Sequence, residues 1–172
     1  MRHVLSVLVQ NQPGVLVRVA SMFSRRGFNI ESLAVGVTET TEYSRITAVV
    51  GGTQAVVNQV VKQLEKLIEV EAVQVLPRDT AVHRGMGIIK VRANVDKRAE
   101  IIKLAEVFRA KVVDVSKNSL IFEITGDDGK MNAFRELMRP YGVLEMIRTG
   151  LVGLLRGNET IYSYQEEQKE NG

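Results

Sequence analysis

Two patterns of apolar residues alternate along the first 77 residues. A run that is apolar almost throughout, such as "HVLSVLV" (3–9), is typical of a buried strand, whereas spacing by i, i+3, i+4 and i+7 is typical of one face of a helix. The helical spacing starts once at Leu16 and again at Val57. Strand-like runs follow at "FNIESLAVGV", "YSRITAVV" and "VEAVQVL". The predicted order of elements is βαββαβ.

The second half of the chain repeats this order. Strands are predicted at "GIIKVRA", "KVVDVS", "SLIFEIT" and "VLEMIRTGLVGLL", and helices near 97–109 and 129–139. A shift of 85 residues carries Phe23 to Phe108 and places "FSRRGFNI" on "FRAKVVDV". Internal similarity of this kind indicates a duplicated unit.

The sequence therefore predicts an α+β fold of two tandem ferredoxin-like βαββαβ domains, each with two helices on one face of a four-stranded sheet. We expect the first domain at 1–77, a linker at 78–85 that Pro77 precedes, and the second domain at 86–160. The remaining residues, 161–172, are polar and without a period, so we expect them to be disordered.

Charge and composition exclude several classes of protein. The net charge of +3 is evenly mixed, with 7 basic and 6 acidic residues in 1–77 and 16 and 14 in 78–172, whereas nucleic-acid binding needs basic charge gathered on one face. No apolar run approaches the ~18 residues of a membrane span. The chain has no Cys, which fits a reducing compartment. We expect a cytoplasmic protein that contacts neither nucleic acid nor membrane.

Candidate catalytic chemistry is sparse. His3 and His83 are the only histidines, and neither belongs to a pattern with metal-ligand spacing or to a nucleophile–base pair. "RGMGIIK" lacks the third glycine of a dinucleotide site, and "GDDGKM" lacks the spacing of a phosphate loop, so an aspartate helix cap explains the latter more simply. We therefore expect no catalytic residue, no metal and no cofactor on this chain.

The segment "RRGFNIESL" (25–33) begins like an RNA-binding signature, which occurs in domains of the same element order. That signature requires further aromatic residues to stack bases, and Asn29, Ile30 and Leu33 occupy those places. An RNA-binding module and an enzyme remain the competing hypotheses.

The loop "QNQPGVL" is the strongest candidate for a binding site. Gly14 has no Cβ, so a ligand can approach the backbone, and the helix that follows begins with N–H groups that have no intrahelical partner. No Lys or Arg lies between residues 3 and 17, which favours a single carboxylate over a pyrophosphate. A zwitterion could place its ammonium on a carbonyl oxygen or on Asn11. The alternative, that Asn11 and Gly14 only make a turn and cap, stays open. The equivalent loop of the second half, "ANVDKRA", has Ala99 in place of the glycine.

Several blocks resemble one family. "RHVLSVLVQNQPGVLVRVASMFSRRGFNIESL", "SRIT" and "GLVGLLRG" are similar to the small regulatory subunit of acetohydroxyacid synthase (acetolactate synthase), whose N-terminal unit is an ACT domain. The likeness covers residues 1–157. The chain departs from the family pattern after Arg84, where Gly85 takes the place of the common Glu. More distant ACT domains usually have Asp where this chain has Asn11, which favours this family.

The resemblance implies a function without catalytic chemistry of its own. Such subunits bind and activate the large catalytic subunit, which is expected to carry thiamine diphosphate, Mg²⁺ and FAD, and they confer feedback inhibition by valine, with isoleucine and leucine as further candidates. Their ACT domains form a homodimer with the effector at its seam. By resemblance, the effector contacts are Asn11, Gly14, Val15 and Leu16, together with Asn29 and Ile30 from the partner protomer.

Overall fold

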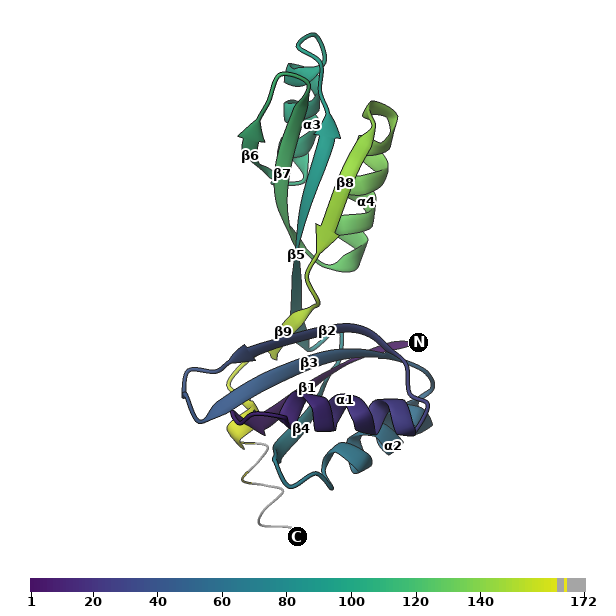
Figure 1. The fold of residues 1–172 in the computed structure, drawn as a ribbon, viewed down its shortest axis with the longest axis vertical. Helices are drawn as coiled ribbons and strands as arrows, with labels where there is room; N and C mark the ends of the chain where they lie inside the picture. Colours follow the sequence, from purple (N-terminus) through teal and green to yellow (C-terminus); the bar gives the residue numbers. More distant parts are fainter. Residues whose placement is uncertain (164–165, 167–172) are drawn as a thin grey trace. The chain divides into compact units, whose positions relative to one another are not determined.

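The computed structural model describes residues 1–163 and 166, and it divides into two compact units (Figure 1). The first unit contains Met1–His83 and the chain from Gly150 onward, and the second contains Arg84–Thr149. Each unit has its own hydrophobic core.

The first unit is a four-stranded antiparallel sheet with two helices on one face (Figure 1). The strand order is β2-β3-β1-β4, which makes β2 and β4 the edge strands. The elements are β1 (Arg2–Gln10), α1 (Val15–Arg25), β2 (Ile30–Val37), β3 (Tyr43–Gly51), α2 (Gln54–Leu64) and β4 (Val70–Leu76).

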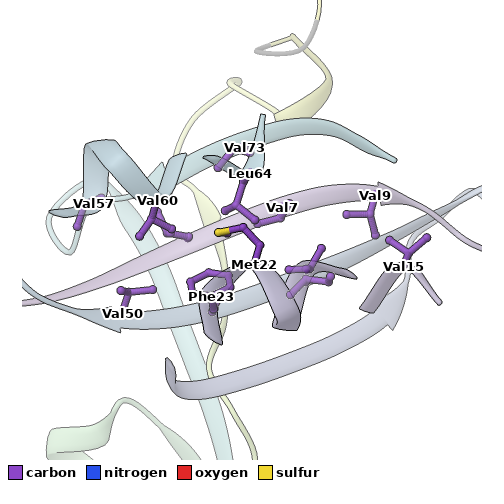
Figure 2. Packing of buried hydrophobic residues seen from close by; sticks show 14 residues of the cluster. Val7, Val9, Val15, Met22, Phe23, Val50, Val57, Val60, Leu64 and Val73 are labelled. Carbon is purple, nitrogen blue, oxygen red and sulfur yellow. The ribbon is translucent and has the colours of Figure 1, made fainter. Parts of the chain in front are cut away.

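The helices and the sheet of this unit meet in an aliphatic core. Side chains alternate along a strand, so every second residue of β1, including Val7, faces the helices. Figure 2 shows Phe23 of α1 and Val60 and Leu64 of α2 directed toward that strand. These are the positions that the helical spacing predicted, and all are at most 2% exposed.

The second unit repeats the arrangement with strand order β6-β7-β5-β8 and two helices on one face (Figure 1). Phe122 and Phe134 are completely buried at its centre. The predicted fold class, two βαββαβ units in tandem, is confirmed. The elements are β5 (Ala81–Arg92), α3 (Arg98–Val107), β6 (Lys111–Val115), β7 (Ser119–Gly126), α4 (Asp128–Met138), the 3₁₀ turn η1 (Arg139–Tyr141) and β8 (Val143–Arg148).

The structure differs from the sequence expectation after residue 148. The run 143–155 was expected to be one strand, but it forms β8 and a separate short strand, β9 (Val152–Leu155), which pairs with β5. From Gly150 onward the chain packs with the first unit, whereas the sequence assigned residues up to 160 to the second domain. The physical reason is burial, because Leu151 lies in a cluster with Val4 and Val49 of the first sheet.

The structure also differs from the disorder expected for 161–172 at the start of this segment. Residues 161–163 are helical, and Ile161 is 1% exposed because it packs on Leu8 and Ala72. Residues 164–165 and 167–172 lie outside the described part of the chain.

Candidate effector site

The loop between β1 and α1 is shaped by the backbone of Gly14. This residue is the N-cap of α1 and has φ +85°, a left-handed conformation that glycine adopts without strain. The helix begins at once, because the N–H of Arg18 donates to the carbonyl of Gly14 at 3.0 Å. Gly14 has no side chain with which to cap the helix, so its first donors are left to other acceptors.

Two of those donors are available to a ligand. The N–H of Val15 makes a long hydrogen bond to the carbonyl of Gln12 at 3.4 Å. Within the part of the chain that the structure describes, the N–H groups of Leu16 and Val17 have no acceptor. Together with the helix dipole they form a seat that suits one carboxylate. Leu16 is among the contacts predicted from the sequence and Val17 is not, although the number of unpaired donors in a first helical turn is a signal for Val17.

Asn11 connects this loop to the hairpin between β2 and β3. Its backbone N–H donates to the carbonyl of Glu42 at 2.8 Å, and its side-chain Nδ2 donates to the carbonyl of Thr41 at 2.9 Å. The Ser44 hydroxyl donates to Asn11 Oδ1 at 3.1 Å. These contacts give Asn11 a structural role, and they leave one amide hydrogen and one Oδ1 lone pair for a ligand.

Arg18 is a cation that the sequence analysis did not associate with the site. Its Nη1 would lie 3.2 Å from a Cβ on Gly14, so the guanidinium group is next to the loop. The signal in the sequence is the i, i+4 spacing from Gly14 along the helix. Glu69 partly neutralises this charge, because its Oε1 lies 2.6 Å from Arg18 Nε. The loop therefore still favours a small anion over a pyrophosphate.

Asn29 and Ile30 lie far from Asn11 and Gly14 within one chain. They come after the C-terminal end of α1, an 11-residue helix about 16 Å long. The strand register agrees, because Ile30 is opposite Val50, whereas Gln10 is opposite Tyr43 at the other end of β3. One protomer does not bring the six predicted site residues together.

The edge strand β2 exposes an apolar stripe. Its helix-facing residues Leu33, Val35 and Val37 are 37%, 48% and 59% exposed, and Leu16 at the start of α1 is 41% exposed. An edge strand with open hydrogen-bonding groups and apolar side chains is suited to pairing with another strand.

Other candidate sites have no support in the described residues. No group of three or more His, Cys, Asp or Glu side chains there could hold a metal ion. Asp127 is the cap of α4, because its Oδ1 accepts from the N–H of Lys130 at 2.9 Å, which confirms the simpler interpretation of "GDDGKM". None of the helices described is both long and apolar enough to cross a membrane.

Comparison with known proteins identifies the family. A family model described as the small subunit of acetolactate synthase matches residues 84–157, and one described as an AHAS small subunit-like ACT domain matches residues 5–72. A probable acetolactate synthase small subunit from Archaeoglobus fulgidus is 53% identical over 159 residues, which are 92% of this chain and 99% of that protein. The chain belongs to the acetolactate synthase small-subunit family.

Further relatives of this family agree over nearly the whole chain. The acetolactate synthase small subunit of Mycolicibacterium smegmatis is 49% identical over 155 residues, covering 90% of this chain and 91% of that protein. The crystal structure of the acetolactate synthase small subunit from Thermotoga maritima superposes with a TM-score of 0.85 at 43% identity, covering 92% of this chain and 99% of that one. The resemblance found in the sequence is confirmed.

The family models also bear on the architecture. The ACT model lies wholly within the first unit, and the second model begins at Arg84, the first residue of the second unit. That second model continues to residue 157, beyond β9. In this member of the family, the end of the matched C-terminal region thus packs on the ACT unit.

Proposed function

We propose that this chain binds a branched-chain amino acid, with valine as the first candidate, at the seam of an ACT homodimer and so regulates the catalytic subunit of acetolactate synthase. Two unpaired backbone donors, at Leu16 and Val17, lie beside the polar loop of Asn11, and this observation carries the proposal. In the presence of the effector the catalytic subunit is inhibited, and in its absence the small subunit raises the catalytic rate.

An amino acid fits this seat by both of its charges. Its carboxylate accepts from the amides that begin α1, and its ammonium group donates to Asn11 Oδ1, which keeps a free lone pair beside the Ser44 contact. Its apolar side chain lies toward the exposed face of Leu16 and Val37. A branched aliphatic chain suits these neighbours because it requires no buried polar partner.

A two-fold axis completes the seat. If β2 pairs antiparallel with β2 of a second copy, the start of one strand lies opposite the end of the other. Asn29 and Ile30 of the partner subunit then approach Val37, at the same end of the sheet as Asn11 and Gly14. This arrangement explains why residues at opposite ends of α1 serve one ligand, and it covers the apolar stripe of β2 with an identical stripe.

The reaction itself belongs to the other subunit in this proposal. Thiamine diphosphate, Mg²⁺ and FAD are assigned to the catalytic subunit. This chain binds that subunit in the cytoplasm and regulates its rate. Inhibition is limited by the difference in valine affinity between the states of the dimer.

Reconstitution tests the proposal directly. The chain alone, given pyruvate, thiamine diphosphate and Mg²⁺, should form no acetolactate. Addition of the chain to its catalytic subunit should raise the rate, and valine should lower it again. Turnover by the chain alone would favour the enzyme hypothesis, and an unchanged catalytic rate in all mixtures would contradict a regulatory role. Retention of the chain on single-stranded RNA at physiological salt would favour the RNA-binding module.

A further inference from the structure

The C-terminal strap, residues 150–163, lies on the face of the ACT sheet opposite the helices. Its Leu151 is 8% exposed in a cluster with Val4, Val49 and Leu76. Farther along, Ile161 is 1% exposed and packs against Leu8. In this unit, then, the sheet face that the helices leave open is covered by the protein's own chain.

The start of the strap contacts β2 with unusual closeness. A Cβ on Gly150 would lie 2.5 Å from the carbonyl oxygen of Leu33 and 3.0 Å from the nitrogen of Ala34, so only glycine fits. The next residue, Leu151, donates its N–H to the Ser32 hydroxyl at 3.2 Å. Ser32 is two residues from Ile30, and β2 is the strand at the proposed dimer seam.

The far end of the strap packs beside the start of β3. Ile161 is buried with Leu8 and Ala72 in a cluster against which Tyr43, the first residue of β3, also packs. The following residue, Ser44, donates to Asn11 Oδ1. The strap therefore contacts strands that carry both halves of the seat, and it does so from the opposite face of the sheet.

The centre of that sheet face is polar, which makes covering it less favourable. Ser6, Thr47 and Gln74 are buried there, next to one another across three strands. Within the described residues the Ser6 hydroxyl is buried without a hydrogen-bond partner. A buried hydroxyl without a partner is less stable than a hydrated one, which reduces the free energy that holds this face closed.

We propose that the strap couples the effector seat to the second unit. Effector binding at the seam displaces β2, the contact of Gly150 and Leu151 with β2 transmits the displacement, and the chain carries it through Thr149 into β8. The coupling rests on the proposed function, because it requires an effector at the seam. It adds a specific route for the inhibitory signal, separate from binding of the amino acid.

The decisive variant is Gly150→Ala in the full-length chain, with Gly36→Ala as its matched control. A Cβ on Gly36, which lies on the same strand β2, meets nothing within 4 Å. Valine binding to the free small subunit is measured by calorimetry, and activation and inhibition are measured after reconstitution with the catalytic subunit. We expect Gly150→Ala to retain valine binding and activation but to raise the half-inhibitory valine concentration by about tenfold or more, within the usual range of allosteric coupling. Gly36→Ala should behave as wild type.

A second variant distinguishes loss of the strap contact from misfolding of Gly150→Ala. Ser32→Ala removes the acceptor for Leu151 without adding volume, so it should fold normally and shift inhibition in the same direction by a smaller factor. Wild-type inhibition in both Gly150→Ala and Ser32→Ala overturns the coupling. Parallel loss of valine binding by the free Ser32→Ala subunit also overturns it, because the contact would then build the seat. Absence of valine binding by the wild-type chain instead contradicts the proposed function.

Discussion

The Ser44 hydroxyl donates to Asn11 Oδ1 at 3.1 Å, while Asn11 Nδ2 donates to the carbonyl of Thr41 at 2.9 Å. The two contacts fix which side of the amide presents oxygen and which presents nitrogen. An aspartate at this position would have to place an oxygen against the Thr41 carbonyl, where no donor remains.

Asn11→Asp should therefore weaken valine binding. The loss of the hydrogen bond to the Thr41 carbonyl and the resulting reorientation of the side chain away from the effector ammonium predict a decrease of roughly tenfold or more, measured by calorimetry on the small subunit. Ser44→Ala is the matched variant, since it removes only the group that orients Asn11, and it should give a smaller decrease. Equal valine affinity in wild type and Asn11→Asp would show that Asn11 is not a ligand contact.

Gly14→Asp should abolish inhibition and spare activation. The new carboxylate occupies the place of the effector carboxylate next to the first amides of α1, and the φ of +85° adds backbone strain. Gly142→Asp is the control, because Gly142 also has a positive φ, +104°, its would-be Cβ makes only an ordinary contact of 3.6 Å with Arg92, and it lies outside the loop and the strap. It should retain both inhibition and activation. Simultaneous loss of activation in Gly14→Asp would contradict separate roles for the seat and the contact with the catalytic subunit.

Val35→Lys should dissociate the ACT dimer. Val35 is 48% exposed on β2, and a lysine there would bury a charge without a partner in the apolar stripe of the proposed seam. Sedimentation equilibrium of the free small subunit measures the change in dimer dissociation constant. Val113→Lys places the same charge on β6, the edge strand of the other sheet, at a residue that is 53% exposed. A dimer that tolerates Val35→Lys would exclude β2 from the seam.

Phe134→Ala should destabilise the second unit selectively. Phe134 is fully buried, and its ring lies 5.5 Å from that of Phe108 and 5.8 Å from that of Phe122. Removing it should cost about 3–5 kcal/mol of unfolding free energy. Hydrogen exchange should locate the loss of protection in residues 84–149, with valine binding by the ACT unit retained. Equal loss of protection in α1 and α2 would mean that the two units unfold together.

The Tyr141 hydroxyl and Lys97 hold the pKa of Glu100 below its ordinary value of 4.5, with the tyrosine hydrogen bond as the larger cause. A carboxyl with a lower pKa in the folded chain stabilises the fold above its unfolded pKa, and this contribution is lost as the pH falls through the folded pKa. Glu100 in turn raises the pKa of Tyr141, so the pair also weakens as the pH rises through that value.

Tyr141→Phe should accordingly lower the melting temperature at neutral pH by a small amount, and the difference from wild type should vanish once the pH falls below the lowered pKa of Glu100. Thermal unfolding across the acid range measures it. In a Glu100→Gln background the same substitution should have no pH-dependent effect. A difference that persists unchanged in acid would assign the effect to packing of the ring.

Much of this protein was determined by the local pattern of its sequence. Apolar runs and the helical period of 3.6 identified both βαββαβ units, since a buried strand is apolar almost throughout and a packed helix is apolar along one face. They also identified Phe23 as a core residue. Gly14 indicated a place where a ligand can approach the backbone, because glycine has no Cβ.

Only the tertiary structure decided what depends on contacts between distant segments. The partners of Asn11, at Thr41 and Ser44, lie some 30 residues away and leave no local signal. The division of 143–155 into β8 and β9 was hidden because apolar residues recur through both halves. It follows from Gly150 meeting the backbone of Leu33, a contact 117 residues apart that only the folded chain creates.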